Sequence, residues 1–255
     1  MRKLSAHRIG SLLAQTKPTV TGKVLALGLF AVAMGYLEAA VVVYLRQIYY
    51  PGGFVFPLNG TIPNLLVEWG REAATLVMLA SIAWLSGRNR LERFSCFLLV
   101  FGVWDICYYL GLKALLGWPP SLLTWDILFL IPLPWVAPVL APVLVSALMI
   151  ALSLGFLNLG RPGRAVHGSP VDWLAIAVGA TAILLSFLSD YGLLVARRGL
   201  PYNLHGLHQG LRADLAAHVP TSYPWGVLVS GLAAIVWAAF FRVYRRSLRP
   251  RERAA

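Results

Sequence analysis

Charged residues are scarce in this sequence, and acidic residues are the scarcest of them. Only 13% of the 255 residues are charged, with 10 Asp and Glu against 22 Lys and Arg, whereas 58% are hydrophobic. Such a composition is far too apolar for a soluble domain. It excludes a soluble fold and predicts an integral membrane protein, whose first partner is the lipid bilayer.

Catalytic motifs are also missing. The sequence has no phosphate-binding glycine loop, no dinucleotide-binding glycine fingerprint, no His-Glu-x-x-His motif and no G-x-S-x-G motif. All five histidines lie outside the apolar runs, which removes the usual pair of intramembrane haem ligands. His205, His208, Asp214 and His218 form only a weak metal-ligand pattern, so we expect no metal site. No cofactor can be named from the sequence.

Only two cysteines are present. Cys96 and Cys107 lie eleven residues apart in one apolar run, which on a helix separates them by about 16 Å along the axis. Because this distance exceeds the reach of a disulfide, we expect both thiols to be free.

Long apolar runs dominate what is present. A helix needs about 20 residues to cross the hydrocarbon core of a bilayer, and six runs reach this length: 23–46, 63–87, 94–117, 125–157, 171–196 and 224–244. We therefore expect an all-α bundle of about six transmembrane helices. It comprises a basic N-terminal segment (1–22), a six-span domain (23–244) and a basic tail (245–255). The small residues Gly35, Ala39, Gly102, Gly179 and Gly231 mark expected points of close helix approach.

The basic residues predict the orientation. The net charge of +12 comes mostly from Lys and Arg in the N-terminal segment, the second and fourth connections and the C-terminal tail. Alternation of this kind places the basic segments on the cytoplasmic side. We expect a multi-pass protein of a bacterial-type inner membrane with both termini in the cytoplasm. The positive charge is explained by topology, so no nucleic-acid partner is expected.

The fourth apolar run is too long for one perpendicular helix and is rich in proline. A proline inside a helix lacks an N–H and collides with the carbonyl four residues back. We predict a short outer helix or re-entrant segment over 125–133, then a kinked span to Leu157. The kink is either repaired by neighbouring helices or lines a cavity. The prolines concerned are Pro132, Pro134, Pro138 and Pro142.

The residue pattern in the last outer loop predicts an amphipathic helix. Leu204, Leu207, Leu211, Leu215 and Val219 recur at helical spacing. This pattern is typical of a helix that lies on the membrane surface.

Six of the ten acidic residues are expected in the outer half of the bundle. Asp105 lies deepest, inside an apolar run, where an acid is costly and marks a functional site. Six carboxylates cannot all be ionised against one arginine unless they bind a cation or keep protons. The candidate ligand- or proton-binding residues are Glu38, Glu68, Arg71, Glu72, Asp105, Tyr109, Asp126 and Asp190.

These features predict an extracytoplasmic polar pocket that binds a small ligand or cation, with or without proton exchange, as in a transporter. Two other hypotheses fit the same residues. Paired carboxylates also serve membrane-embedded enzymes that act on lipid-linked or periplasmic substrates. Alternatively, the acids form a structural ion-pair network in an assembly or scaffold subunit with a membrane-protein partner.

Overall fold

The computed structural model of the protein describes residues 19–57, 65–159, 168–197 and 217–244. Most of this part of the chain is helical, as the apolar runs predict. Its elements are α2 (Val20–Tyr49), α3 (Leu65–Ser86), α4 (Arg90–Leu116), β1 (Trp125–Phe129), β2 (Trp135–Pro138), α5 (Leu140–Leu159), α6 (Pro170–Arg197), α8 (Trp225–Ile235) and the π-helix η1 (Val236–Tyr244), which continues α8.

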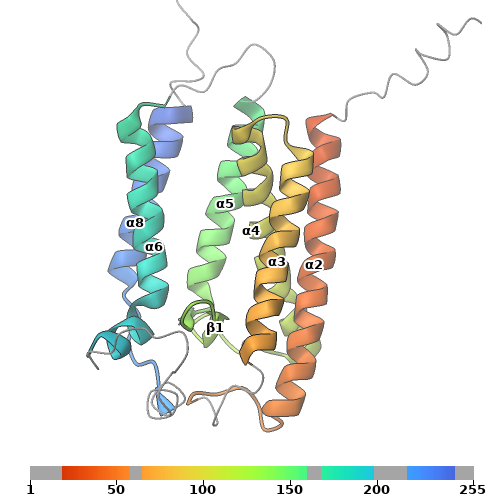
Figure 1. Cartoon of the computed structure of the whole chain (residues 1–255), viewed down its shortest axis with the longest axis vertical. Helices are drawn as coiled ribbons and strands as arrows, with labels where there is room; N and C mark the ends of the chain where they lie inside the picture. The colour runs from red at the N-terminus through yellow and green to blue at the C-terminus, as the bar shows by residue number, and fades with distance from the viewer. Residues whose placement is uncertain (1–18, 58–64, 160–167, 198–216, 245–255) are drawn as a thin grey trace, which may run out of the picture.

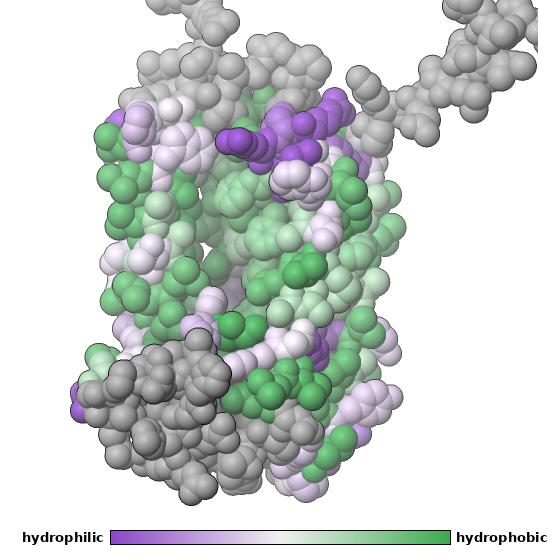
Figure 2. Space-filling model, in the orientation of Figure 1, coloured by the Kyte–Doolittle hydropathy of each residue, from purple (hydrophilic) through white to green (hydrophobic). Residues whose placement is uncertain are grey.

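Within these described ranges, five helices are long and apolar enough to cross a membrane: α2, α4, α5, α6 and α8 with most of η1. They support the prediction of a multi-pass membrane protein. The helix α3 falls outside this group, and it carries Glu68, Arg71 and Glu72 near its start. The exposed side chains of the bundle are apolar over much of its length, as Figure 2 shows; Leu25, Leu85 and Leu174 are each at least 63% exposed.

The helices run side by side, with both ends of the described chain at one end of the bundle and the two strands at the other (Figure 1). We call these the termini end and the hairpin end. The helix α4 packs against α2, α3 and α5, and α6 packs against α8. One buried apolar cluster lies chiefly among α2, α3 and α4, and a second joins α5, α6, α8 and β2.

Small residues allow the closest helix contacts, as the sequence predicts. A Cβ atom on Gly35 would lie 2.7 Å from the carbonyl oxygen of Trp104, and one on Gly102 would lie 2.6 Å from that of Ser146. Across the α6–α8 pair, a Cβ on Gly179 would lie 2.7 Å from the carbonyl oxygen of Gly231. These distances are too short for any side chain, so glycine sets the separation of the helices.

Local signals fix both ends of α4, which carries the deepest acid. Asn89 caps its first turn by accepting a hydrogen bond from the backbone N–H of Glu92 over 2.9 Å. Gly117 ends it in a left-handed conformation with φ of 68°, which glycine adopts without strain.

The segment before α5 differs from the helix predicted there. Residues Trp125–Phe129 and Trp135–Pro138 form an antiparallel hairpin in which Asp126 is the partner of Ala137. Pro138 therefore ends a strand, and Pro142 lies in the first turn of α5, where its missing N–H breaks no helical bond. The prolines therefore lie before the span or in its first turn. The loss of helical hydrogen bonds expected from Pro138 and Pro142 inside a helix does not occur.

Several predictions concern other parts of the chain. The amphipathic helix predicted from Leu204 falls almost entirely within residues 198–216, outside the described ranges, as do most of the basic segments 1–22 and 245–255. Cys96 and Cys107 are both free, as predicted.

Candidate functional site

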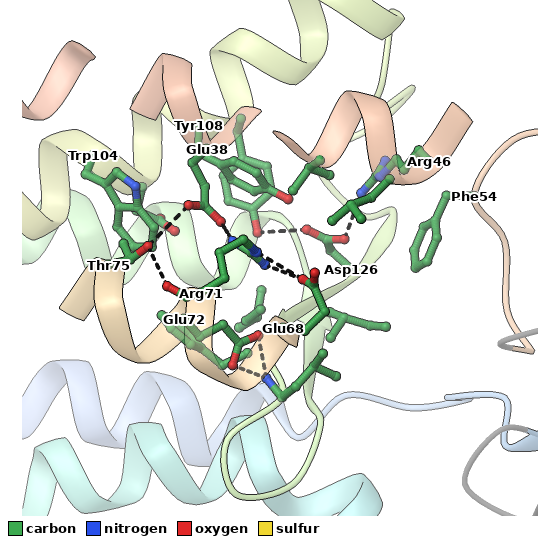
Figure 3. Close-up of a pocket in the computed structure, with 18 of the residues that line it drawn as sticks. Glu38, Arg46, Phe54, Glu68, Arg71, Glu72, Thr75, Trp104, Tyr108 and Asp126 are labelled. Carbon is green, nitrogen blue, oxygen red and sulfur yellow. Dashed lines mark hydrogen bonds and ion pairs between the residues drawn. The ribbon is translucent and has the colours of Figure 1, made fainter. Parts of the chain in front are cut away.

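The helices α2, α3 and α4 and the hairpin enclose a cavity of about 160 Å³ (Figure 3). A protein cavity of about 150 Å³ holds a benzene molecule, so this one has room for a small ligand. Of the eight candidate residues from the sequence, the structure brings seven around this one space: Glu38, Glu68, Arg71, Glu72, Asp105, Tyr109 and Asp126.

Arg71 lies between two glutamates at the centre of the site (Figure 3). Its Nη1 donates to Oε1 of Glu38 on α2, and its Nε donates to Oε2 of Glu68 over 2.9 Å on its own helix. Thr75 donates to the other oxygen of Glu38 over 3.4 Å. Glu68, Arg71 and Thr75 share one face of α3 because they recur at helical spacing. One guanidinium thus serves two carboxylates.

Glu72 holds the hairpin to α3. Its spacing from Glu68 and Arg71 also allows the three to form an ion-pair cluster, but both of its carboxylate oxygens accept the backbone N–H of Leu130, each over 3.0 Å. Trp69 donates to the carbonyl oxygen of Leu130 over 3.1 Å. Side chains of α3 therefore bond both the N–H and the carbonyl oxygen of Leu130. Buried backbone groups need such partners.

A second ion pair in the cavity wall joins α2 to the hairpin. Nη2 of Arg46 donates to Oδ1 of Asp126 over 3.1 Å, and the hydroxyl of Tyr109 donates to Oδ2 over 3.2 Å. The guanidinium carbon of Arg46 lies 3.7 Å from the ring centroid of Trp118 and 4.6 Å from that of Phe54, close enough for cation–π attraction to both. Burial raises the pKa of Asp126 to about 6, although the charge of Arg46 opposes the rise.

Asp105 has the sparsest set of partners among the cavity acids. Oγ of Ser146, on α5, donates to its Oδ2 over 2.8 Å. Tyr108 and Tyr109 follow Asp105 by three and four residues, a spacing that allows either hydroxyl to reach it, but in the structure the hydroxyl of Tyr109 is bonded to Asp126. Among the described residues, no arginine, lysine or backbone N–H is bonded to Asp105. This carboxylate lines the cavity with one neutral donor.

Two hydrogen-bond donors in the cavity wall have no acceptor within the described part of the chain. They are Nε1 of Trp104 and Nη1 of Arg46. Both residues are more than nine-tenths buried, at 5% and 8% exposure. A buried donor without an acceptor costs about 1–3 kcal/mol, so these two atoms indicate where an occupant of the cavity would place oxygen or nitrogen acceptors.

Asp190, the eighth candidate, is not part of this cavity lining. It lies near the end of α6, where its Oδ2 is 2.7 Å from Nε2 of His218. Asp214, which precedes His218 by one helical turn in the sequence, falls outside the described residues. Asp190 and His218 form a separate polar contact that ties α6 to the segment before α8.

Sequence reasoning missed several residues of the cavity wall. Arg46 resembles an interfacial residue at a helix end, and its burial depends on the distant residues Asp126 and Trp118. Trp104 directly precedes Asp105 on α4, a spacing that does not predict a shared face, yet it lines the cavity, as does Tyr108, whose spacing of three residues from Asp105 indicated it.

The cavity acids do not form a metal cage. Within the described ranges, no three His, Cys, Asp or Glu side chains come close enough together to hold a metal ion. Comparisons with protein-family models, curated proteins and solved structures found no match. Function is therefore inferred from the cavity itself.

Proposed function

We propose that the chain is a six-span protein of a bacterial-type inner membrane, with its hairpin end facing away from the cytoplasm. The sixth span is α3: its buried positions include Glu72 and Thr75, whereas Leu66, Val77 and Leu85 are exposed. A helix that turns its charges toward the bundle and its leucines outward is suited to lipid contact. This orientation is supported by the basic residues of the termini end, which belong to the cytoplasmic side.

Reporter fusions test this orientation. Fusions at Asn89, Gly163 and the C-terminus are expected to report the cytoplasm, and fusions at Asn59 and His208 the opposite side. A C-terminal reporter on the outside would contradict the proposal.

We further propose that the cavity binds a small ligand or cation, with proton exchange, as a transporter does. The observation that carries this proposal is Asp105, which lies near the centre of an apolar helix, lines the cavity and, among the described residues, has a serine hydroxyl as its one hydrogen-bond partner. Five acids and two arginines line the same space. If all are ionised, negative charge is in excess, and a cation or retained protons must balance it.

Thermal unfolding of the purified protein tests cation binding. The panel contains sodium, potassium, magnesium and small organic amines at constant ionic strength. A ligand at 100 times its Kd stabilises a protein by about 2.7 kcal/mol, which raises Tm by roughly 5–11 °C for a chain of this size. Asp105→Asn should abolish the increase. Asp190→Asn, which removes an acid outside the cavity lining, is the matched control and should retain it.

Flux separates transport from the two rival functions. A transporter moves the stabilising cation into liposomes and, with proton exchange, changes the internal pH. An enzyme forms product in detergent without flux, and a scaffold subunit copurifies with partners and shows neither activity. Absence of any cation-dependent stabilisation and any flux would contradict the proposed function.

A further inference from the structure

The walls around Asp105 combine one poorly partnered carboxylate with aromatic rings. Trp104 precedes Asp105 on α4, and Tyr108 and Tyr109 follow it by about one turn; all three residues line the cavity. Carboxylates and aromatic faces together attract organic cations, because the faces of the rings carry partial negative charge. An inorganic ion would instead need several converging oxygen ligands, and the described acids provide no group of three.

The other acids of the cavity already have charged or N–H partners, so an ammonium group is best placed at Asp105. Asp126 has Arg46, Glu38 and Glu68 have Arg71, and Glu72 has the N–H of Leu130. Asp105 is thus the carboxylate for which a ligand would supply the missing positive charge.

The indole of Trp104 adds a second requirement. Its Nε1–H is buried without an acceptor, and the residue is 5% exposed. Figure 3 draws this side chain toward one side of the cavity and Phe54 toward the other. Trp104 and Asp105 both line the cavity, so one small molecule inside it can reach both. A ligand with an oxygen next to its ammonium group would accept the indole hydrogen bond.

We propose that the cavity binds a small amino alcohol, with its ammonium nitrogen facing Asp105 and its oxygen accepting the hydrogen bond from Trp104. This inference rests on the proposed function and narrows its ligand to an organic cation. The amino alcohol is either free in solution or the headgroup of a phospholipid.

Calorimetric titration of the purified full-length protein with ethanolamine and ethylamine tests this inference, because both are protonated amines and only ethanolamine has the oxygen. Ethanolamine should bind about three- to tenfold more tightly, the worth of one neutral hydrogen bond. Asp105→Asn should weaken both ligands by about tenfold or more. Trp104→Phe should remove the difference between the two amines, whereas Trp84→Phe, at an exposed tryptophan outside the cavity lining, should preserve it.

If Trp104→Phe fails to fold, the comparison of ethanolamine and ethylamine binding to the wild-type protein still tests whether the ligand needs an oxygen. Equal binding of the two amines by the wild-type protein would overturn the amino-alcohol assignment. Binding of sodium or potassium that depends on Asp105, without binding of either amine, would overturn the organic cation but leave the proposed function standing. If no member of the cation panel binds and no flux occurs, the proposed function fails as well.

Vesicles distinguish the two sources of the amino alcohol. The protein is reconstituted in phosphatidylglycerol with and without phosphatidylethanolamine, and free ethanolamine is then titrated. Weaker ethanolamine binding in the vesicles with phosphatidylethanolamine identifies the lipid headgroup as the occupant. Unchanged binding identifies the free amino alcohol.

Discussion

Replacing Arg46 with methionine removes the guanidinium that pairs with Asp126 and keeps much of the apolar volume of the side chain. Asp126 is 2% exposed, so its charge would stay buried after losing the one ion-pair partner that it has in the described part of the chain. Breaking a buried pair from one side costs about 3–5 kcal/mol. For a chain of this size, a loss of about 3 kcal/mol corresponds to a fall in Tm of roughly 6–12 °C.

The loss should depend on pH because Asp126 can take up a proton. Its ordinary pKa of 3.8 is raised to about 6 in the folded protein; without Arg46 the folded pKa is higher, since burial still raises it and the opposing charge is gone. A group whose pKa is raised by folding costs stability as pH rises from the unfolded to the folded pKa. The wild-type protein completes this loss near pH 6, so the gap between it and Arg46→Met should open above about pH 6.

Thermal unfolding in detergent at about pH 5 and about pH 8 measures this gap. At pH 5 the variant should lose only its cation–π contacts with Trp118 and Phe54, about 1 kcal/mol. Arg197→Met, at an exposed position near the end of α6, is the matched control and should leave Tm unchanged. Arg46→Met with Asp126→Asn should recover much of the loss at pH 8. A gap of equal size at both pH values would refute the reasoning.

Two further changes probe the packing of the bundle. Gly179→Ala places a Cβ 2.7 Å from the carbonyl oxygen of Gly231 and should cost about 1–3 kcal/mol, seen as a lower Tm; Gly192→Ala on the same helix meets nothing within 4 Å and should not reduce it. Glu72→Ala removes the acceptor of the Leu130 N–H and should cost about 1–3 kcal/mol, whereas Glu72→Gln retains an oxygen and should cost less; equal losses in the two variants would show that the hydrogen bond is unimportant.

Depth in the bundle could be predicted from the sequence, but lateral position could not. Counting residues along each helix places Glu38 and Arg71 at similar depth, and the structure joins them. The same count places Asp190 in the same half of the bundle. Asp190 is nevertheless not in the cavity lining, because α6 packs against α8 and the Asp190 side chain pairs with His218. The depth of a residue follows from its position in one helix, whereas its neighbours depend on how all the helices pack.

The hairpin shows a second limit. Its apolar sequence is compatible with either a buried strand or a buried helix, and periodicity alone cannot distinguish the two. Pro132, Pro134 and Pro138 argue against a continuous helix, and aromatic and branched residues favour strands. The decisive contacts are the pairing of β1 with β2 and the capture of Leu130 by Glu72, both of which depend on tertiary structure.

The pairing of Arg46 with Asp126 has a consequence for biosynthesis, because the two residues are 80 positions apart. When α2 leaves the ribosome and enters the bilayer, the acid that will neutralise its arginine has not been synthesised. Arg46 lies in the last turn of α2, and from that position a long side chain can reach the lipid headgroups. The arginine side chain can therefore stay at the membrane interface until the hairpin has been synthesised and packs against it. The order in which the helices are made thus favours a helix end as the position for a charge whose partner comes late.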